Sequence, residues 1–226
     1  MKQFLRFLAL IVASVFPLAG MATNYFISVA GTTVTSDNAQ NITNANIIGG
    51  RITFDASTNT LTLRNVVMRT SDYGIYVSDK SFNKLHIVLE GNNYFEHVNG
   101  QKAALVIYKS RYATDSTEPN CYIEGKGSLL LQDNDIVFGN GVSICIGNGT
   151  PGGEGYGGPA IYANSMYSKE GSDMAEFRIT DGAVFLSGSD EGTLRNFKSL
   201  HGFGSYGVLD MGLHTPEGGR YDYNGD

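Results

Sequence analysis

The feature that most constrains the fold is a segment that recurs three times with the same layout of strand, tight turn and strand. The copies are LHIVLEGNNYF from Leu85, CYIEGKGSLLLQ from Cys121 and FRITDGAVFLSG from Phe177, so their starts are 36 and 56 residues apart. In each copy an alternating apolar run leads to an acid–Gly pair, and a second apolar run follows. Such segments cannot bury their apolar faces alone, which predicts coils that stack on one another.

These repeats predict an all-β protein. A right-handed parallel β-helix accounts for them best, because its turns vary in length and its corners suit Asn and Gly. A β-sandwich also uses many short strands and stays open as the alternative. Residues 51–68 predict a hairpin or a tight strand-turn-strand corner, in which the cluster DASTN turns the chain between two alternating runs.

The repeats are assigned to one β-helix domain, residues 23–226. Residues 23–46 are rich in Asn and Thr, and we expect them to form an extended strand region that caps the first coil. The final stretch, HTPEGGRYDYNGD, is polar and Gly-rich and offers no closing strand. The sequence therefore leaves open whether this domain lacks its C-terminal cap.

Gly147, Gly149 and Gly152 have the spacing G-x-G-x-x-G and follow the apolar run SICI, as in a dinucleotide-binding turn. That turn requires a helix directly after it, but Pro151 lies inside the motif and further glycines continue to Gly158. A helix cannot nucleate in such a stretch. We interpret the motif as a turn-rich loop that leaves a coil, and we reject nucleotide binding.

The first 22 residues have the pattern of a cleaved signal peptide. Lys2 and Arg6 precede an apolar stretch, and Gly20 and Ala22 form a small-x-small cleavage site before Thr23. We therefore expect a mature chain that is secreted, periplasmic or held at the cell surface. It carries 14 basic against 22 acidic residues, a net charge of −8, which argues against nucleic acid as a partner. No later segment is long and apolar enough to be a transmembrane helix.

The two cysteines, Cys121 and Cys145, allow two interpretations. They could form one disulfide in an oxidising compartment, or they could be small buried residues on stacked strands. Two cysteines do not make a structural zinc site, and the four histidines show no metal-ligand spacing. No Ser-His-Asp arrangement can be assembled either, so we assign no catalytic residue.

The phrase ITFDASTNTLTLRNV resembles a recurrent line of exported bacterial proteins described as carbohydrate-binding domain-containing proteins, common in gut Bacteroidales. The stretch IGNGTPGGEGYGGPAIYA is similar to Gly-rich turns of the same family. The resemblance covers about residues 45–190 and rests on structural motifs. It implies a parallel β-helix, related in shape to pectate lyases, that binds acidic plant polysaccharide with calcium. No catalytic residue of the family maps onto this chain.

We expect a non-catalytic protein that binds polysaccharide, because tyrosine rings can stack on sugar rings with their polar tips left free. Long excursions from a regular scaffold are where binding residues gather. The expected carbohydrate-binding residues lie in or after two such excursions: Arg111, Tyr112, Tyr156, Tyr162 and Tyr167.

The segment QDNDI supplies the expected calcium ligands. On a strand Asp133 and Asp135 would share one face and could reach one ion, although an Asn/Asp turn explains the same residues. The cation could bridge an acidic glycan or serve a polysaccharide lyase, which also needs a base. Arg111, Lys126 and Arg178 are available as that base, but none has a compelling partner. A structural or adhesive surface protein without a glycan ligand is the third possibility.

Overall fold

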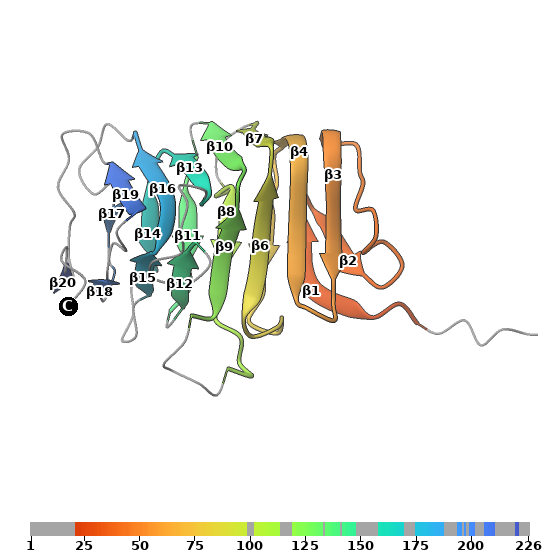
Figure 1. The fold of residues 1–226 in the computed structure, drawn as a ribbon. Coiled ribbons are helices and arrows are strands. Elements are labelled where there is room, and N and C mark those ends of the chain that lie inside the picture. Colours follow the sequence, from red (N-terminus) through yellow and green to blue (C-terminus); the bar gives the residue numbers. More distant parts are fainter. Residues whose placement is uncertain are drawn as a thin grey trace, which may run out of the picture.

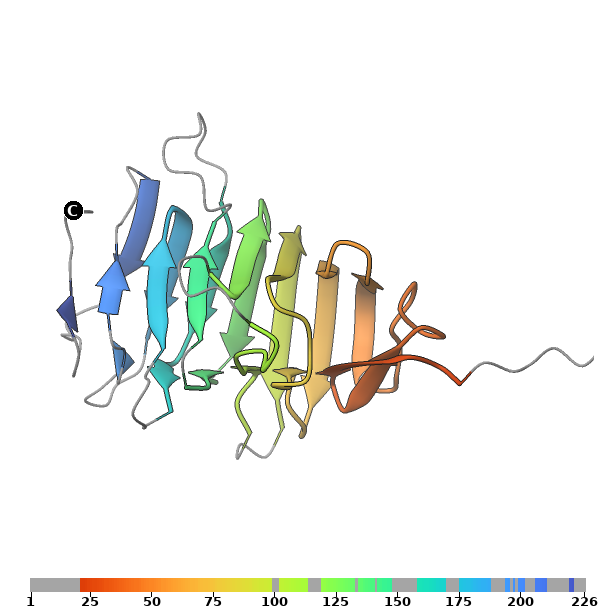
Figure 2. The same ribbon diagram turned by 90° about the horizontal axis from the view of Figure 1, so that it is seen from below.

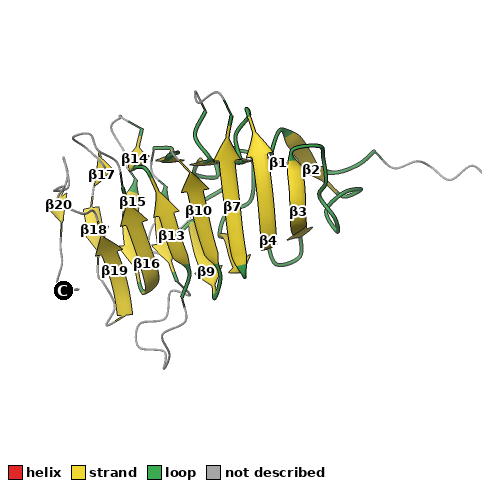
Figure 3. Cartoon of the chain, turned by 90° about the horizontal axis from the view of Figure 1, so that it is seen from above, coloured by secondary structure: helices red, strands yellow, loops and turns green. Residues whose placement is uncertain are grey.

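The computed structural model describes residues 21–98, 102–113, 119–132, 134–140, 142–147, 158–169, 175–187, 194–195, 197, 199–201, 206–210 and 220–221. Every regular element within these ranges is a strand, as the colours of Figure 3 show. The prediction of an all-β protein is therefore confirmed. The expected signal peptide falls almost entirely on residues 1–20, outside the described residues.

Three rows of parallel strands run along the molecule. The first row contains β5 (Ile75–Val77), β8 (Leu105–Ile107), β11 (Ile136–Phe138), β14 (Met166–Ser168) and β17 (Leu194–Arg195). The second contains β6 (Leu85–Glu90), β9 (Cys121–Gly125), β12 (Ser143–Ile146), β15 (Glu176–Ile179), β18 (Ser199–His201) and β20 (Arg220–Tyr221). The third contains β7 (Asn92–His97), β10 (Ser128–Gln132), β13 (Ala160–Ala163), β16 (Asp181–Leu186) and β19 (Tyr206–Asp210).

One strand from each row makes up a coil, because the chain visits the first, second and third rows in turn. The first coil is β5–β6–β7, and β8–β9–β10 follows directly in the same order. Successive coils lie side by side in Figure 1, and the view from below in Figure 2 shows the same stack. The architecture is β-helix-like, and its parallel pairing differs from the antiparallel sheets of a β-sandwich.

The repeats seen in the sequence correspond to the second and third strands of a coil. The three copies are β6–β7, β9–β10 and β15–β16, and the long interval holds a fourth pair, β12–β13. The Gly-rich stretch interrupts that fourth pair, which explains the irregular spacing. Gly147 lies at the corner after β12 with φ 106°, whereas Gly149 and Gly152 lie outside the described residues. The position of Gly147 at the end of a strand agrees with the interpretation of the G-x-G-x-x-G motif as a loop that leaves a coil.

The interior is filled by apolar side chains that repeat at matching register from coil to coil. One such row is Ile75, Leu105, Ile136, Met166 and Leu194. Each of these side chains is fully buried. Neighbouring strands are about 4.8 Å apart, so each side chain contacts its equivalents in the coils before and after it. The shared core explains why one coil could not be stable alone.

The corner between the second and third rows requires an unusual backbone. Asn65, Gly91, Gly125 and Gly147 occupy this corner in successive layers with φ of 49°, 64°, 101° and 106°. At Gly91 an added Cβ would lie 2.0 Å from Oδ1 of Asn65, so a side chain does not fit. Glycine is needed there both for its left-handed conformation and for the close approach.

A buried asparagine completes the same corner. Asn93 is 1% exposed, and its Oδ1 accepts a hydrogen bond from the amide of Val66 at 2.9 Å. Its Nδ2 donates to the carbonyls of Glu90 at 3.3 Å and Ser128 at 3.0 Å. These three backbone groups come from three successive layers of the stack. Asn93 therefore satisfies polar groups that the turn removes from strand pairing.

Antiparallel strands close the N-terminal end of the stack. β1 (Asn24–Val29) pairs antiparallel with β2 (Thr32–Thr35) and with β5. β3 (Ile47–Asp55) and β4 (Thr60–Thr70) form the predicted hairpin, whose turn places Asn59 at φ 54°. β4 then pairs with β6 through its first half and with β7 through its second. The predicted hairpin is confirmed, and the strands within residues 23–46 lie where a cap was expected.

The two cysteines lie on neighbouring strands but on opposite faces of the sheet. Cys121 is paired with Ile144, and Cys145 is paired with Tyr122, so the two positions differ by one residue in register. Both thiols are buried, and the two are not joined by a disulfide. Burial, together with the nearby Cys145, raises the pKa of the Cys121 thiol. The interpretation as two small buried residues therefore holds, and a disulfide would require one strand to turn over.

We expect two free thiols per chain after purification in air, neither of them reactive toward iodoacetamide until the protein unfolds, because the thiolate is the reactive form. Alkylation in guanidinium chloride without reductant, followed by intact mass spectrometry, should add two carbamidomethyl groups. Thiols that appear only after reduction would contradict the strand register.

Asn93→Ala should lower the free energy of unfolding by about 2–4 kcal/mol, since it removes the side chain that binds one amide and two carbonyls at a buried corner. Denaturant titration followed by circular dichroism measures this loss. The neighbouring Asn92 is exposed, and its Oδ1 accepts a bond from Oγ of Ser128 at 3.1 Å. Asn92→Ala should therefore cost less than about 1 kcal/mol. Equal losses in the two variants would contradict the role given to Asn93.

Candidate functional site

A pocket of about 540 Å³ opens at the N-terminal end of the stack. It lies where β1, the turn between β5 and β6, and the turn after β8 come together. We call it the N-terminal pocket. Its lining residues are Thr23, Asn24, Tyr25, Phe26, Ala56, Lys80, Ser81, Phe82, Asn83 and Tyr112. Ligand pockets commonly measure about 300–1,000 Å³, so the size suits a small ligand or one end of a larger one.

Packed aromatic rings form the base of this pocket. The rings of Tyr25 and Phe82 are 5.9 Å apart, and both contact the buried Phe54 at 4.9 and 5.7 Å between centroids. Phe54 comes from β3 of the N-terminal hairpin, whereas Phe82 comes from the first coil. Aromatic contact therefore joins the cap to the first coil and leaves Tyr25 and Phe82 only partly buried.

Phe26 stands at the mouth of the pocket in a strained conformation. Its φ is 57°, a region that bulky residues rarely occupy, and its side chain is 42% exposed. The register of β1 against β2 shifts between Asn24 and Ser28, which marks an irregularity in the strand at this residue. Oδ1 of Asn24 accepts the amide of Phe26 at 2.7 Å and holds the distortion. Strain of this kind is concentrated at functional sites.

Polar side chains line the rim of the same pocket. The ammonium of Lys80 lies 5.9 Å from the centre of the Phe26 ring. Nδ2 of Asn120, from the second coil, donates to Oδ1 of Asn83 at 3.3 Å and fixes the orientation of that amide. Ser81 is buried and donates to the carbonyl of Tyr25 at 3.0 Å. The rim thus offers an ammonium group and amides next to aromatic faces.

The second coil brings two of the predicted residues to this region. The amide of Arg111 donates to the carbonyl of Asp79 at 2.8 Å, and its guanidinium contacts the Asp79 carboxylate at 2.5 Å. Hydrogen bonding to that guanidinium lowers the pKa of Asp79. Tyr112 follows directly and is 67% exposed at the pocket. The two predicted residues Arg111 and Tyr112 therefore lie at or beside the N-terminal pocket.

The structure does not bring the other predicted tyrosines to the pocket. Tyr162 is 40% exposed on the outer face of the third row, where its ring stacks on Phe185 at 4.7 Å. Tyr167 lies on the outer face of the first row, paired with Val137. Tyr156 lies outside the described residues. The predicted sugar-binding residues are therefore spread over at least two faces.

Asp135 serves to join coils. Its Oδ1 accepts hydrogen bonds from Nδ2 of Asn164 at 3.0 Å and from Oγ of Ser165 at 2.7 Å, both from the next coil. Asp133 lies outside the described residues. Within the described ranges no three His, Cys, Asp or Glu side chains gather to hold a metal ion. The calcium site at Asp133 and Asp135 stays a prediction. Asp135 lies between β10 and β11 and not within a strand, a position that fits the alternative of an Asn/Asp turn.

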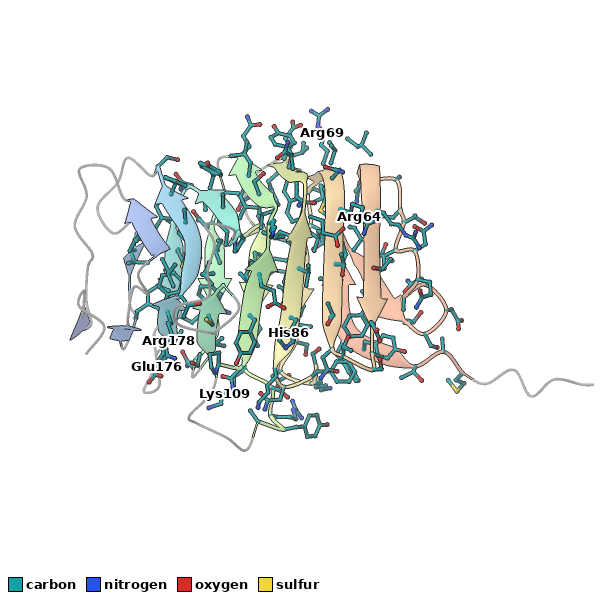
Figure 4. All side chains as sticks on the ribbon, viewed as in Figure 1. Arg64, Arg69, His86, Lys109, Glu176 and Arg178 are labelled. Carbon is teal, nitrogen blue, oxygen red and sulfur yellow. The ribbon has the colours of Figure 1, made fainter. Side chains whose placement is uncertain are left out.

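A second polar cluster lies on the outer face of the second row, where Figure 4 labels His86. Nδ1 of His86 is 2.8 Å from Oε1 of Glu124, and the imidazole stacks on Tyr122 at 4.8 Å. Figure 4 also places Arg64 and Arg178 on this side of the molecule. Since Glu124 and Tyr122 occupy one nitrogen and one face of the ring, the cluster links the first two coils.

Sequence reasoning missed most of the pocket. Asn24, Tyr25 and Phe26 were expected only as part of an extended cap, and Lys80 and Phe82 were not singled out. The one local signal was Phe82, an aromatic residue inside the polar turn SDKSFNK. Aromatic residues in polar turns are unusual unless something contacts them.

Comparison with known proteins gives no relative from which a function could be transferred: no family model, curated protein or solved structure matches the chain. In the residues that the structure describes, no helix has the length and apolar character to cross a membrane.

Proposed function

We propose that the protein is exported and binds carbohydrate without catalysing a reaction, and that the N-terminal pocket receives a sugar unit. The observation that carries this proposal is the strained Phe26 at the mouth of a pocket with exposed and half-buried aromatic rings. Sugar rings stack on aromatic faces, and their hydroxyl groups need polar partners at the edge. Tyr112 supplies an exposed ring, and Lys80 and Asn83 supply such partners.

The chemistry of the lining favours binding over hydrolysis. The described residues that line the pocket include no Asp, Glu or His. Glycoside hydrolysis commonly needs two carboxyl groups at a fixed separation across the scissile bond. The nearby carboxylate of Asp79 is held in an ion pair with Arg111. We therefore place the lyase and hydrolase alternatives behind simple binding.

We further propose that the coils belong to a right-handed parallel β-helix, the form that the resemblance to exported carbohydrate-binding proteins implies. The parallel rows and the three-strand coils support this proposal. Crossovers between parallel strands of one sheet are right-handed in nearly all proteins. Calcium stays part of the proposal only as a prediction for acidic glycans.

Tyr112→Ala should weaken binding to the preferred polysaccharide at least about tenfold, because it removes the most exposed ring of the pocket. Retention of the purified protein on immobilised acidic and neutral polysaccharides, first with calcium and then with chelator, measures this. Tyr162→Ala is the matched control, since it removes a half-exposed ring from a different face and should leave retention unchanged.

Either of two results would overturn the proposal. The first is an absence of retention on every polysaccharide, which would favour a structural or adhesive surface role. The second is loss of retention in Tyr162→Ala with full retention in Tyr112→Ala, which would move the site to the third row. Retention that disappears with chelator would instead support the calcium prediction.

Phe26→Gly separates function from stability. Glycine adopts φ 57° without strain, so the free energy of unfolding should change by less than about 1 kcal/mol while binding weakens. Thermal denaturation and retention of the same preparation give both quantities. A variant that binds as tightly as the parent would show that Phe26 does not serve the pocket, and a variant that is much less stable would show that Phe26 has a structural role.

A further inference from the structure

Three tyrosines and two lysines gather on the outer face of the first row, apart from the N-terminal pocket. The rings of Tyr73 and Tyr76 are 5.2 Å apart, and that of Tyr108 is 5.8 Å from Tyr76. The ammonium of Lys102 lies 4.9 Å from the Tyr73 ring centre, and that of Lys169 lies 4.8 Å from the Tyr108 ring centre. We call these five residues the tyrosine–lysine surface.

The stacking of coils brings these residues together from distant parts of the chain. The amide of Tyr108 donates to the carbonyl of Val77, and the amide of Lys169 donates to the carbonyl of Phe138. Tyr108 and Lys169 thus follow equivalent strands two coils apart, with Gly139 between them. A Cβ at Gly139 would lie 2.5 Å from Cδ1 of Tyr108, so the missing side chain leaves room for that ring. Lys169 reaches across this gap and donates to the hydroxyl of Tyr108.

The two ammonium groups stay charged and accessible. Hydrogen bonding raises the pKa of both, through the hydroxyl of Tyr108 for Lys169 and through Asp72 for Lys102. Nζ of Lys102 is 2.8 Å from Oδ1 of Asp72, and both side chains are 43% exposed, so an incoming anion can compete with Asp72. His97 lies close to Asp72, and its two ring nitrogens are buried with no hydrogen-bond partner among the described residues.

Cations of the described surface differ in the groups that they contact. Arg64, Arg69 and Arg111 each contact a carboxylate, from Glu90, Glu96 and Asp79 respectively. At Lys169 the described contacts are instead the hydroxyl and the ring of Tyr108. On a chain with net charge −6, this surface places two lysines on ring faces within one cluster of tyrosines. Rings beside cations suit a ligand that is flat, partly apolar and negatively charged.

We propose that the tyrosine–lysine surface is a second binding subsite, which takes an anionic sugar unit of a polysaccharide by stacking on tyrosine and pairing its carboxylate or sulfate with Lys169 and Lys102. This inference rests on the proposed carbohydrate binding. In this proposal the two lysines bind the negative charge of the sugar unit, and no metal ion is required. Burial and the neighbouring Tyr108 raise the pKa of Tyr76, and the carboxylate of Asp79 adds to that rise. The same carboxylate pairs with Arg111 beside the N-terminal pocket, so Asp79 lies between the two sites.

The test compares charged and uncharged forms of the same polymer. Isothermal titration in chelator, at low and at high salt, is run with a polyuronate and its methyl ester, and with dextran sulfate and dextran. The double variant Lys102→Gln with Lys169→Gln should lose roughly tenfold in affinity for the charged member of the pair that binds. Its affinity for the uncharged member should not change. A loss of affinity for the polyuronate would identify carboxylate as the group recognised, and a loss for dextran sulfate would identify sulfate.

Lys126→Gln is the matched control, because Lys126 is exposed at the opposite corner of the second coil and the variant removes the same charge. It should bind like the parent, and thermal denaturation checks that all variants are folded. Tyr108→Ala should weaken binding of both members of a pair, since stacking does not depend on charge.

Three outcomes would overturn the inference. They are equal affinity of the parent for charged and uncharged polymers, a preference that appears only with calcium, and loss of the preference in Lys126→Gln. After any of these outcomes, carbohydrate binding at the N-terminal pocket would still be supported if the parent bound an uncharged polymer and Tyr112→Ala abolished that binding. An absence of binding to every polymer would overturn both proposals together.

Discussion

The structure depends on one backbone constraint, the sharp corner between the second and third strands of each coil. At that corner the chain changes direction within one or two residues in the first two coils, and the next strand must still lie in register with the coil before it. Left-handed residues make the turn, and the buried Asn93 binds the backbone groups that the turn leaves unpaired. Without that corner the rows of buried apolar side chains would not align, and the coils would have no shared core.

The regular coils also determine which side chains meet on the surface. The strands of each row present equivalent positions at a spacing of about 4.8 Å, so side chains far apart in the sequence meet on the surface. Tyr108 and Lys169 are 61 residues apart and share a hydrogen bond, as do Arg111 and Asp79 from successive coils. The turns between the first and second strands vary in length, and the N-terminal pocket forms where two of them meet β1. The regular part of the fold provides rigidity, and the irregular part provides a concave site.

Much of the fold was predictable because its signals are local. Alternating apolar residues identified the strands, DASTN identified the hairpin turn, and Pro151 excluded a dinucleotide-binding helix. The site was less predictable because it depends on register between coils. Arg111 and Tyr112 were found because they lie in a long polar excursion, whereas Phe26 gave no sign in the sequence of its positive φ. A tyrosine in a strand, such as Tyr76, is also common in any sheet, so its position next to Tyr108 could be known only from the stack.

The central claim is that sugar binds where β1 meets the turns of the first two coils. The most direct test is a backbone amide NMR titration of the purified protein with oligosaccharides released from the polysaccharide that retains it. The account predicts that the largest shifts occur at residues 24–26, 80–83 and 111–112, with little change in β10 and β13. Shifts centred on the outer face of β10 and β13, around Leu130 and Tyr162, would contradict it.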